Sequence, residues 1–164
     1  MCNLAFLLIV FPLLADGPGD IGNLKKLGAR MKFDDRGRAI EINLGERRVG
    51  DADLVHLKGF THLEELDLTR TRITGAGLEH FKGLASLRRL YLTDTKVDGA
   101  ALAHLKHLTK LELIGLSGTK AGDVGLGHLH ELMALRQVFC IGAGVSEAGA
   151  EKLQKALPKC RIIH

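Results

Sequence analysis

The chain has 164 residues, a length that suits a single domain. Hydrophobic residues make up 46% of it and aromatic residues only 4%, so we expect an aliphatic core and exclude a disordered or collagenous chain. The 23 Lys and Arg residues against 19 Asp and Glu residues give a net charge of +4, and because both signs alternate along the chain, this balance does not indicate a polyanionic partner.

The first predicted element is an uncharged apolar run at residues 4–14. Its 11 residues are too few to cross a bilayer as a helix, but they suit the hydrophobic region of a secretory signal peptide. We predict a signal peptide over residues 1–15, cleaved after Ala15, and export to the periplasm or secretion; without that signal the protein would be cytoplasmic. Because no Lys or Arg precedes the run, an apolar N-terminal helix stays open as the alternative.

Residues 16–38 predict an N-terminal cap. A short helical pattern at 21–27 is followed by two extended segments, 29–33 and 38–44, on either side of a turn at 34–37. We expect the resulting helix and hairpin strand to cover the first coil of the segment that follows.

Residues 39–158 divide into five rows with a period of 24 residues, in which Leu63, Leu87, Leu111 and Leu135 align. Apolar residues alternate at row positions 4 and 6, as in a strand, and recur at positions 16, 19 and 22 with helical spacing. Thr74, Asp98 and Ser146 lie between the two patterns, where each can cap a helix N-terminus.

The second and third rows read LEELDLTRTRITGAGLEHFKGLAS and LRRLYLTDTKVDGAALAHLKHLTK. They resemble the leucine-rich repeat family in the form L-x-x-L-x-L-x-x-T-x-[IV]-[TD]-x-x-G-L, similar to repeats of F-box adaptors and of short bacterial proteins abundant in planctomycetes. The resemblance implies an α/β leucine-rich repeat solenoid, a right-handed arc with a parallel sheet on its concave face and helices on its convex face. The usual Asn or Cys at position 9 is Thr71, Thr95 or Thr119 here, whose hydroxyl we expect to bond to the main chain.

The C-terminal end predicts a last helix at 151–157, a break at Pro158 and a capping strand at 159–164. Cys140 and Cys160 fall at apolar places, so we expect buried thiols, with a disulfide between them as the alternative.

The sequence contains no motif that predicts a catalytic, cofactor or metal site. Phosphate-loop, dinucleotide-binding and nucleophile-elbow motifs are missing, and the sequence HELMA at 130–134 lacks the second His of a zinc-protease motif. Histidines align at row position 18, but on parallel helices their rings would point the same way rather than converge on one metal; they are His56, His80, His104 and His128.

Basic residues form two further columns, which we interpret as a solvated rim. Nucleic acid is not a predicted partner, because it would require aromatic platforms among the cations and the chain has one Tyr and six Phe. The columns comprise Arg48, Arg72, Lys96 and Lys120 at position 10, and Lys58, Lys82 and Lys106 at position 20.

Row positions 3, 5 and 7 should face the concave side, because positions 4 and 6 point into the core. That face divides into a polar, acidic half and an apolar half around a dip at Gly115, beside Arg88 and Arg136. Apolar groups within a charged rim are typical of protein-binding hot spots. The predicted partner-binding residues are Tyr91, Leu113, Phe139, Ile141, Arg89, Glu65 and Asp67.

From these patterns we predict a non-catalytic module that binds a partner protein through its concave sheet face, with no stable membrane span. Self-association through the apolar half is an alternative use of the same face. Two other functions stay open: a substrate-recognition adaptor in a ubiquitin-ligase-like or signalling complex, suggested by the F-box likeness, and an enzyme with an unrecognised site.

Overall fold

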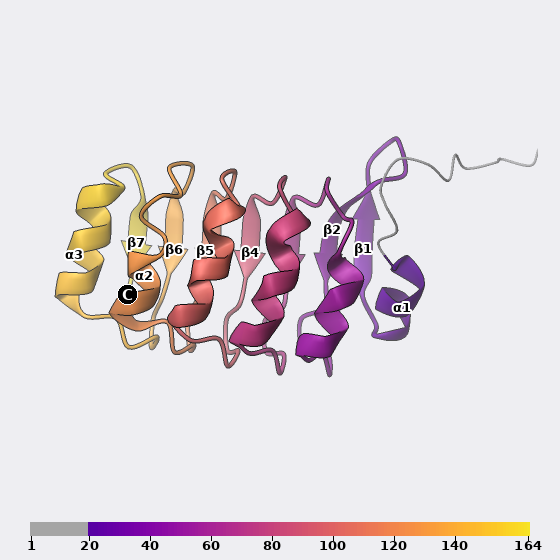
Figure 1. Cartoon of the computed structure of the whole chain (residues 1–164), viewed down its shortest axis with the longest axis horizontal. Coiled ribbons are helices and arrows are strands. Elements are labelled where there is room, and N and C mark those ends of the chain that lie inside the picture. The colour runs from indigo at the N-terminus through magenta and orange to yellow at the C-terminus, as the bar shows by residue number, and fades with distance from the viewer. Residues whose placement is uncertain (1–19) are drawn as a thin grey trace, which may run out of the picture.

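The computed structural model describes residues 20–164 as one seven-stranded sheet with helices along one face (Figure 1). The signal peptide predicted over residues 1–15 lies outside the described residues. The strands follow chain order across the sheet: β1 (Arg30–Phe33), β2 (Ala39–Asn43), β3 (Glu65–Asp67), β4 (Arg89–Tyr91), β5 (Leu113–Gly115), β6 (Gln137–Phe139) and β7 (Arg161–Ile163).

The strands β2 to β7 are parallel, and every pair is offset by one row of the repeat. Leu66 lies beside Leu90, and Leu90 beside Ile114, so residues 24 apart in the sequence are neighbours in the sheet. Each of these three side chains is fully buried. The predicted α/β leucine-rich repeat architecture is therefore confirmed.

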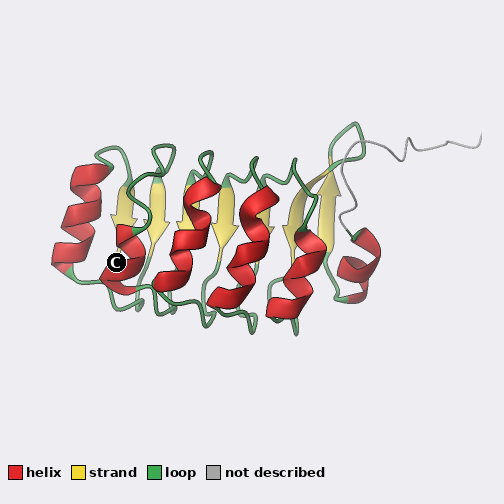
Figure 2. Cartoon of the chain, in the orientation of Figure 1, coloured by secondary structure: helices red, strands yellow, loops and turns green. Residues whose placement is uncertain are grey.

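The helices lie on one face of the sheet and leave the other face open (Figure 2). Their bounds are α1 (Ile21–Lys26), η1 (Asp51–Leu57), η2 (Gly75–Gly83), η3 (Ala100–His107), α2 (Gly122–Gly127) and α3 (Glu147–Ala156). The three η elements are 3₁₀ helices rather than the α-helices that the apolar spacing suggests. Neighbouring strands lie about 4.8 Å apart whereas packed α-helices need 8–10 Å, so a narrower helix lets successive rows stack more closely.

Small residues at row position 15 also permit this close stacking. A Cβ atom on Gly77 would lie 2.6 Å from both Asp51 Oδ1 and Leu54 Cδ1 of the preceding row. At the same row position, a Cβ atom on Gly125 would lie 2.9 Å from Leu102 Cδ1. A side chain at either position would therefore force these neighbouring side chains to move.

The corner after each of the three central strands, β3, β4 and β5, combines a left-handed residue with a buried threonine. Arg70 and Asp94 adopt φ of 55° and 54° at row position 8. The next residue turns inward: Thr95 is 5% exposed, and its hydroxyl donates to the Leu92 carbonyl at 2.7 Å. Thr71 and Thr119 make the same bond at 2.6 Å, which confirms the predicted role of these hydroxyls.

The predicted N-caps form and connect neighbouring rows. The Asp98 side chain accepts from Ala101 N at 3.0 Å, and the Ser146 hydroxyl accepts from Gly149 N at 3.1 Å. The Thr74 hydroxyl donates to Asp51 Oδ2 at 2.6 Å, and the Ser146 hydroxyl donates to Asp123 Oδ2 at 2.7 Å. A carboxylate at the start of one helix thereby holds the cap of the next.

The two ends of the stack differ. At the first end β1 pairs antiparallel with β2, and Leu24 of α1 is fully buried in the core. At the other end β7 continues the parallel sheet beside β6, and α3 is the longest of the described α-helices. No helix within residues 20–164 has the length and apolar character to traverse a membrane.

Candidate functional site

The sheet face opposite the helices, here called the open face, carries all seven predicted partner-binding residues. Strand pairing aligns Glu65, Arg89 and Leu113 in one column and Asp67, Tyr91 and Gly115 in the next. Phe139 continues the second column on β6, and Ile141 follows that strand with 57% of its surface exposed. The predicted residues thus lie together on one face.

The polar half of the open face is neutralised by contacts between neighbouring strands. Lys32 Nζ lies 2.7 Å from Glu41 Oε2, and the Arg89 guanidinium lies 2.6 Å from Glu65 Oε2. Asp67 accepts a hydrogen bond from the Asn43 amide at 2.9 Å. The acidic side chains of this half therefore have partners within the chain.

The three arginines of the expected charged rim all have partners within the chain. Arg88 pairs with Glu112, and Arg89 with Glu65. Arg136 donates to the main-chain carbonyls of Met133 at 3.1 Å and Leu135 at 3.0 Å. The sequence did not show this because each partner is set by the register of the rows and by side-chain conformation.

The expected dip at Gly115 is also corrected, since Tyr91 covers it. A Cβ atom on Gly115 would lie 3.5 Å from Tyr91 Cδ1 and 3.1 Å from Thr93 Oγ1. Burial of the Tyr91 ring raises the pKa of its phenol, and the negative charge of Glu65 raises it further. The ring thus lies along the sheet and joins the two halves of the open face.

Partly or largely exposed apolar side chains form the other half, here called the apolar patch. Ile163 is not among the predicted residues, but it pairs with Phe139 and therefore extends the second column onto β7. The parallel register of the closing strand, one row beyond the last complete repeat, is the signal that would have found it. The apolar patch consists of Tyr91, Leu113, Phe139, Ile141 and Ile163.

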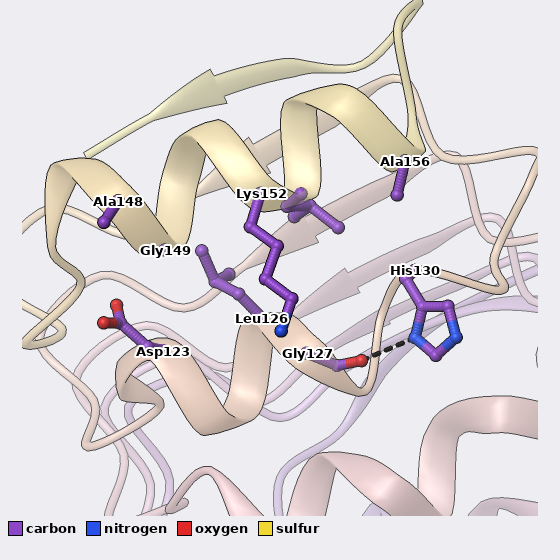
Figure 3. A pocket seen from close by; sticks show the side chains of 9 residues that line it. Asp123, Leu126, Gly127, His130, Ala148, Gly149, Lys152 and Ala156 are labelled. Carbon is purple, nitrogen blue, oxygen red and sulfur yellow. Dashed lines mark hydrogen bonds between the residues drawn. The ribbon is translucent and has the colours of Figure 1, made fainter.

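A pocket lies on the helical side of the molecule, between α2 and α3 (Figure 3). It has a volume of about 560 Å³, with Leu126 and Leu153 among its apolar lining and Gly127, Ala148 and Ala156 at its walls. The repeat pattern gives no sign of this pocket. It is bounded by α2, which ends at Gly127, and by α3, which continues to Ala156.

Three ionisable side chains line this pocket: Asp123, His130 and Lys152. The hydroxyl and main-chain N–H of Ser146 donate to Asp123 and lower its carboxyl pKa. His130 Nδ1 lies 2.6 Å from the Gly127 carbonyl. Lys152 extends from α3 across the pocket toward α2, and it has no ion-pair partner among residues 20–164 (Figure 3).

The described histidines and cysteines that the sequence offered for a metal site, a disulfide or a nucleophile do not form one. Within the described part of the chain no three His, Cys, Asp or Glu side chains are grouped to hold a metal ion, and His56 instead contacts Asp20 at 3.2 Å. Cys140 and Cys160 are free and buried, and burial raises the pKa of each thiol to about 11. The Cys140–Cys160 disulfide alternative is therefore wrong for this structure, and neither thiol is activated as a nucleophile.

Comparisons with known proteins agree with this architecture. A family model described as "Leucine rich repeat" matches residues 61–120. Among solved structures, a leucine-rich repeat protein of Leptospira interrogans superposes with a TM-score of 0.55 at 23% identity, over 67% of this chain and 27% of its own. The chain thus spans about a quarter of that protein's length.

Internalin C2 of Listeria monocytogenes has a TM-score of 0.47 at 14% identity, over 91% of this chain and 87% of its own. No curated protein sequence matches the chain. The matched rows, the 24-residue register and the Leptospira structure lead to one conclusion: residues 61–120 match the leucine-rich repeat family, and the described part of the chain has the leucine-rich repeat fold.

Proposed function

We propose that the chain is a non-catalytic interaction module that binds a partner protein through the open face. Leucine-rich repeats generally mediate protein–protein interaction. The observation that carries the proposal here is the apolar patch, where Ile141 is 57% exposed beside the partly exposed Tyr91 and Phe139. Side chains of this type on an uncovered sheet face are the usual centre of a protein interface.

The charge arrangement supports apolar recognition by this face. Since Glu65, Arg89 and Arg88 are paired within the chain, a partner would have to break existing contacts to use them. Exposed ion pairs contribute little net energy and are screened by salt. Binding should therefore depend on apolar area, and raising the salt concentration should weaken it less than a charge-driven contact.

The test compares capture of partners from a native extract by three forms of the protein. Tyr91→Ala with Phe139→Ala removes the centre of the apolar patch and should abolish capture. The matched control, Val124→Ala with Met133→Ala, removes two apolar side chains that are 67% and 68% exposed away from the open face. Equal loss of capture in the control, or retention in the open-face variant, would refute the proposal.

Export is a separate part of the proposal. The apolar run at residues 4–14 supports a signal peptide that is cleaved after Ala15, and hence a periplasmic or secreted protein. N-terminal sequencing of the protein from its native source tests this. A mature chain that begins at Asp16 is the expected result, and an intact Met1 would contradict it.

A further inference from the structure

We propose that the partner protein presents an acidic side chain to Arg161, next to apolar side chains that cover Phe139 and Ile163. This inference rests on the function proposed for the open face, and it specifies the chemistry of the partner. Arg161 is not among the predicted partner-binding residues. It lies on β7, the last strand of the described sheet (Figure 1), and its side chain is exposed.

Among the described residues, the charged side chains at row position 3 are paired along the sheet, except that of Arg161. Glu41 contacts Lys32 at 2.7 Å, and Glu65 contacts Arg89 at 2.6 Å. Within residues 20–164, the Arg161 side chain makes neither an ion pair nor a hydrogen bond. A partner can therefore pair with this guanidinium without breaking an existing contact.

The residue one row earlier explains why Arg161 is unpaired. Glu65 lies beside Arg89 in the sheet, whereas the residue beside Arg161 is Gln137. An amide can accept a hydrogen bond, but it carries no charge to neutralise a guanidinium. The register that forms an ion pair between β3 and β4 thus leaves the cation of β7 without a carboxylate in the described chain.

Arg161 borders the apolar patch. Arg161 and Ile163 are alternate residues of one strand, so their side chains point to the same side of the sheet, and Ile163 lies beside Phe139. A partner that covers these apolar side chains removes water from around the guanidinium, which strengthens its attraction to a carboxylate. Because a guanidinium only donates hydrogen bonds, it favours an acidic side chain over a neutral or basic one. We expect the apolar area to supply most of the affinity, and Arg161 to select the partner by its charge.

The test selects binders of the full chain from a displayed library of random dodecapeptides. We expect the selected peptides to carry Asp or Glu next to large apolar residues. Replacement of that acidic residue by its amide, in a selected peptide, should weaken binding at least about threefold, since it removes a charge-assisted hydrogen bond.

Three variants assign this preference to one residue. Arg161→Glu should change the preferred side chain from acidic to basic. Gln137→Glu should recreate, between β6 and β7, the ion pair of Glu65 with Arg89, and so remove the preference without altering Arg161. Arg30→Glu changes the charge by the same amount on β1, at the opposite edge of the sheet, and should keep the acidic preference. All three substituted residues are exposed, so each variant should fold, which circular dichroism checks.

The variant Tyr91→Ala with Phe139→Ala separates this inference from the function on which it rests. Peptides that lose binding to this variant, but have no acidic preference or keep one with Arg161→Glu, would overturn the role of Arg161 and leave the proposed function intact. A selection without any peptide that depends on Tyr91 and Phe139 would also overturn the inference. The capture experiment with the native extract would then decide the function of the open face.

Discussion

Each of the three central rows is held at its corner by one buried hydroxyl. Thr95 replaces the amide or thiol usual at this position with a shorter side chain, and it still reaches the Leu92 carbonyl at 2.7 Å. Because the side chain is only 5% exposed, water cannot take over this bond when the hydroxyl is removed. The corner therefore depends on a single polar atom in each of the three central rows.

Thr95→Val keeps the shape of the side chain and removes its donor. We expect the free energy of unfolding to fall by about 1–2 kcal/mol, the usual cost of a lost buried hydrogen bond. Urea denaturation measures this. Thr109→Val, at an exposed position, should change stability by less than about 0.5 kcal/mol, and an equal loss in both variants would contradict the buried role.

Tyr91 is the one tyrosine of the chain, so its ionisation can be followed directly by ultraviolet absorbance. Burial first, and the charge of Glu65 second, raise its pKa above the ordinary value of 10.0. The folded protein then keeps a proton that the unfolded chain has lost, so this group makes stability decline as the pH rises above about 10.

We expect the Tyr91 midpoint to lie above 10 in the folded protein and to return to about 10 in urea. Glu65→Gln should lower the folded midpoint, because it removes a nearby negative charge. Glu151→Gln, on α3, should leave it unchanged. A folded midpoint at or below 10 would show that the ring does not lie against the sheet as described.

At the scale of elements, the helices depend on how closely successive rows approach. The apolar spacing predicts that helices exist at these places, but not their type, since the 3₁₀ form follows from the distance between rows rather than from the residues of one row. The residues that indicate this close approach are the glycines at row position 15, Gly77 and Gly125. Without the neighbouring row, however, a glycine there looks like part of a turn.

Two glycines of η2 provide a matched test of this packing. A Cβ atom on Gly77 would lie 2.6 Å from Leu54 Cδ1, whereas one on Gly83 would meet nothing within 4 Å. Gly77→Ala should reduce the free energy of unfolding by about 1–3 kcal/mol, because the preceding row must move. Gly83→Ala should be neutral or slightly stabilising, and thermal melts that rank the two variants in the opposite order would contradict the packing.

The strands and their register could be predicted almost completely, because a fixed period places equivalent residues side by side. The open-face residues follow from the same rule, as Glu65, Arg89 and Leu113 show. The pairing of Arg89 with Glu65, the lie of Tyr91 over Gly115 and the pocket at Lys152 could not be predicted. They depend on side-chain conformation and on helix ends, which a period does not specify. The division into cap and repeats at residue 39 stays a prediction.

For the whole molecule, stability comes from contacts between neighbouring rows, because no row can bury its own apolar residues. Leu90 lies at the middle of the sheet, fully buried between Leu66 and Ile114. Leu90→Ala should cost about 2–5 kcal/mol and lower the melting temperature of the entire stack. Ile141→Ala, at a 57% exposed position, should cost less than about 1 kcal/mol; similar losses would contradict the assignment of inner and outer faces.

The proposed function places the partner protein on the open face and leaves the helical face outside that interface. Hydroxyl-radical footprinting of the chain with and without a captured partner tests this most directly, because it reports the accessibility of individual side chains. We expect the partner to protect Tyr91, Phe139 and Ile141, while Val124 and Met133 are oxidised as before. Protection of Val124 and Met133, with the open face still oxidised, would contradict it.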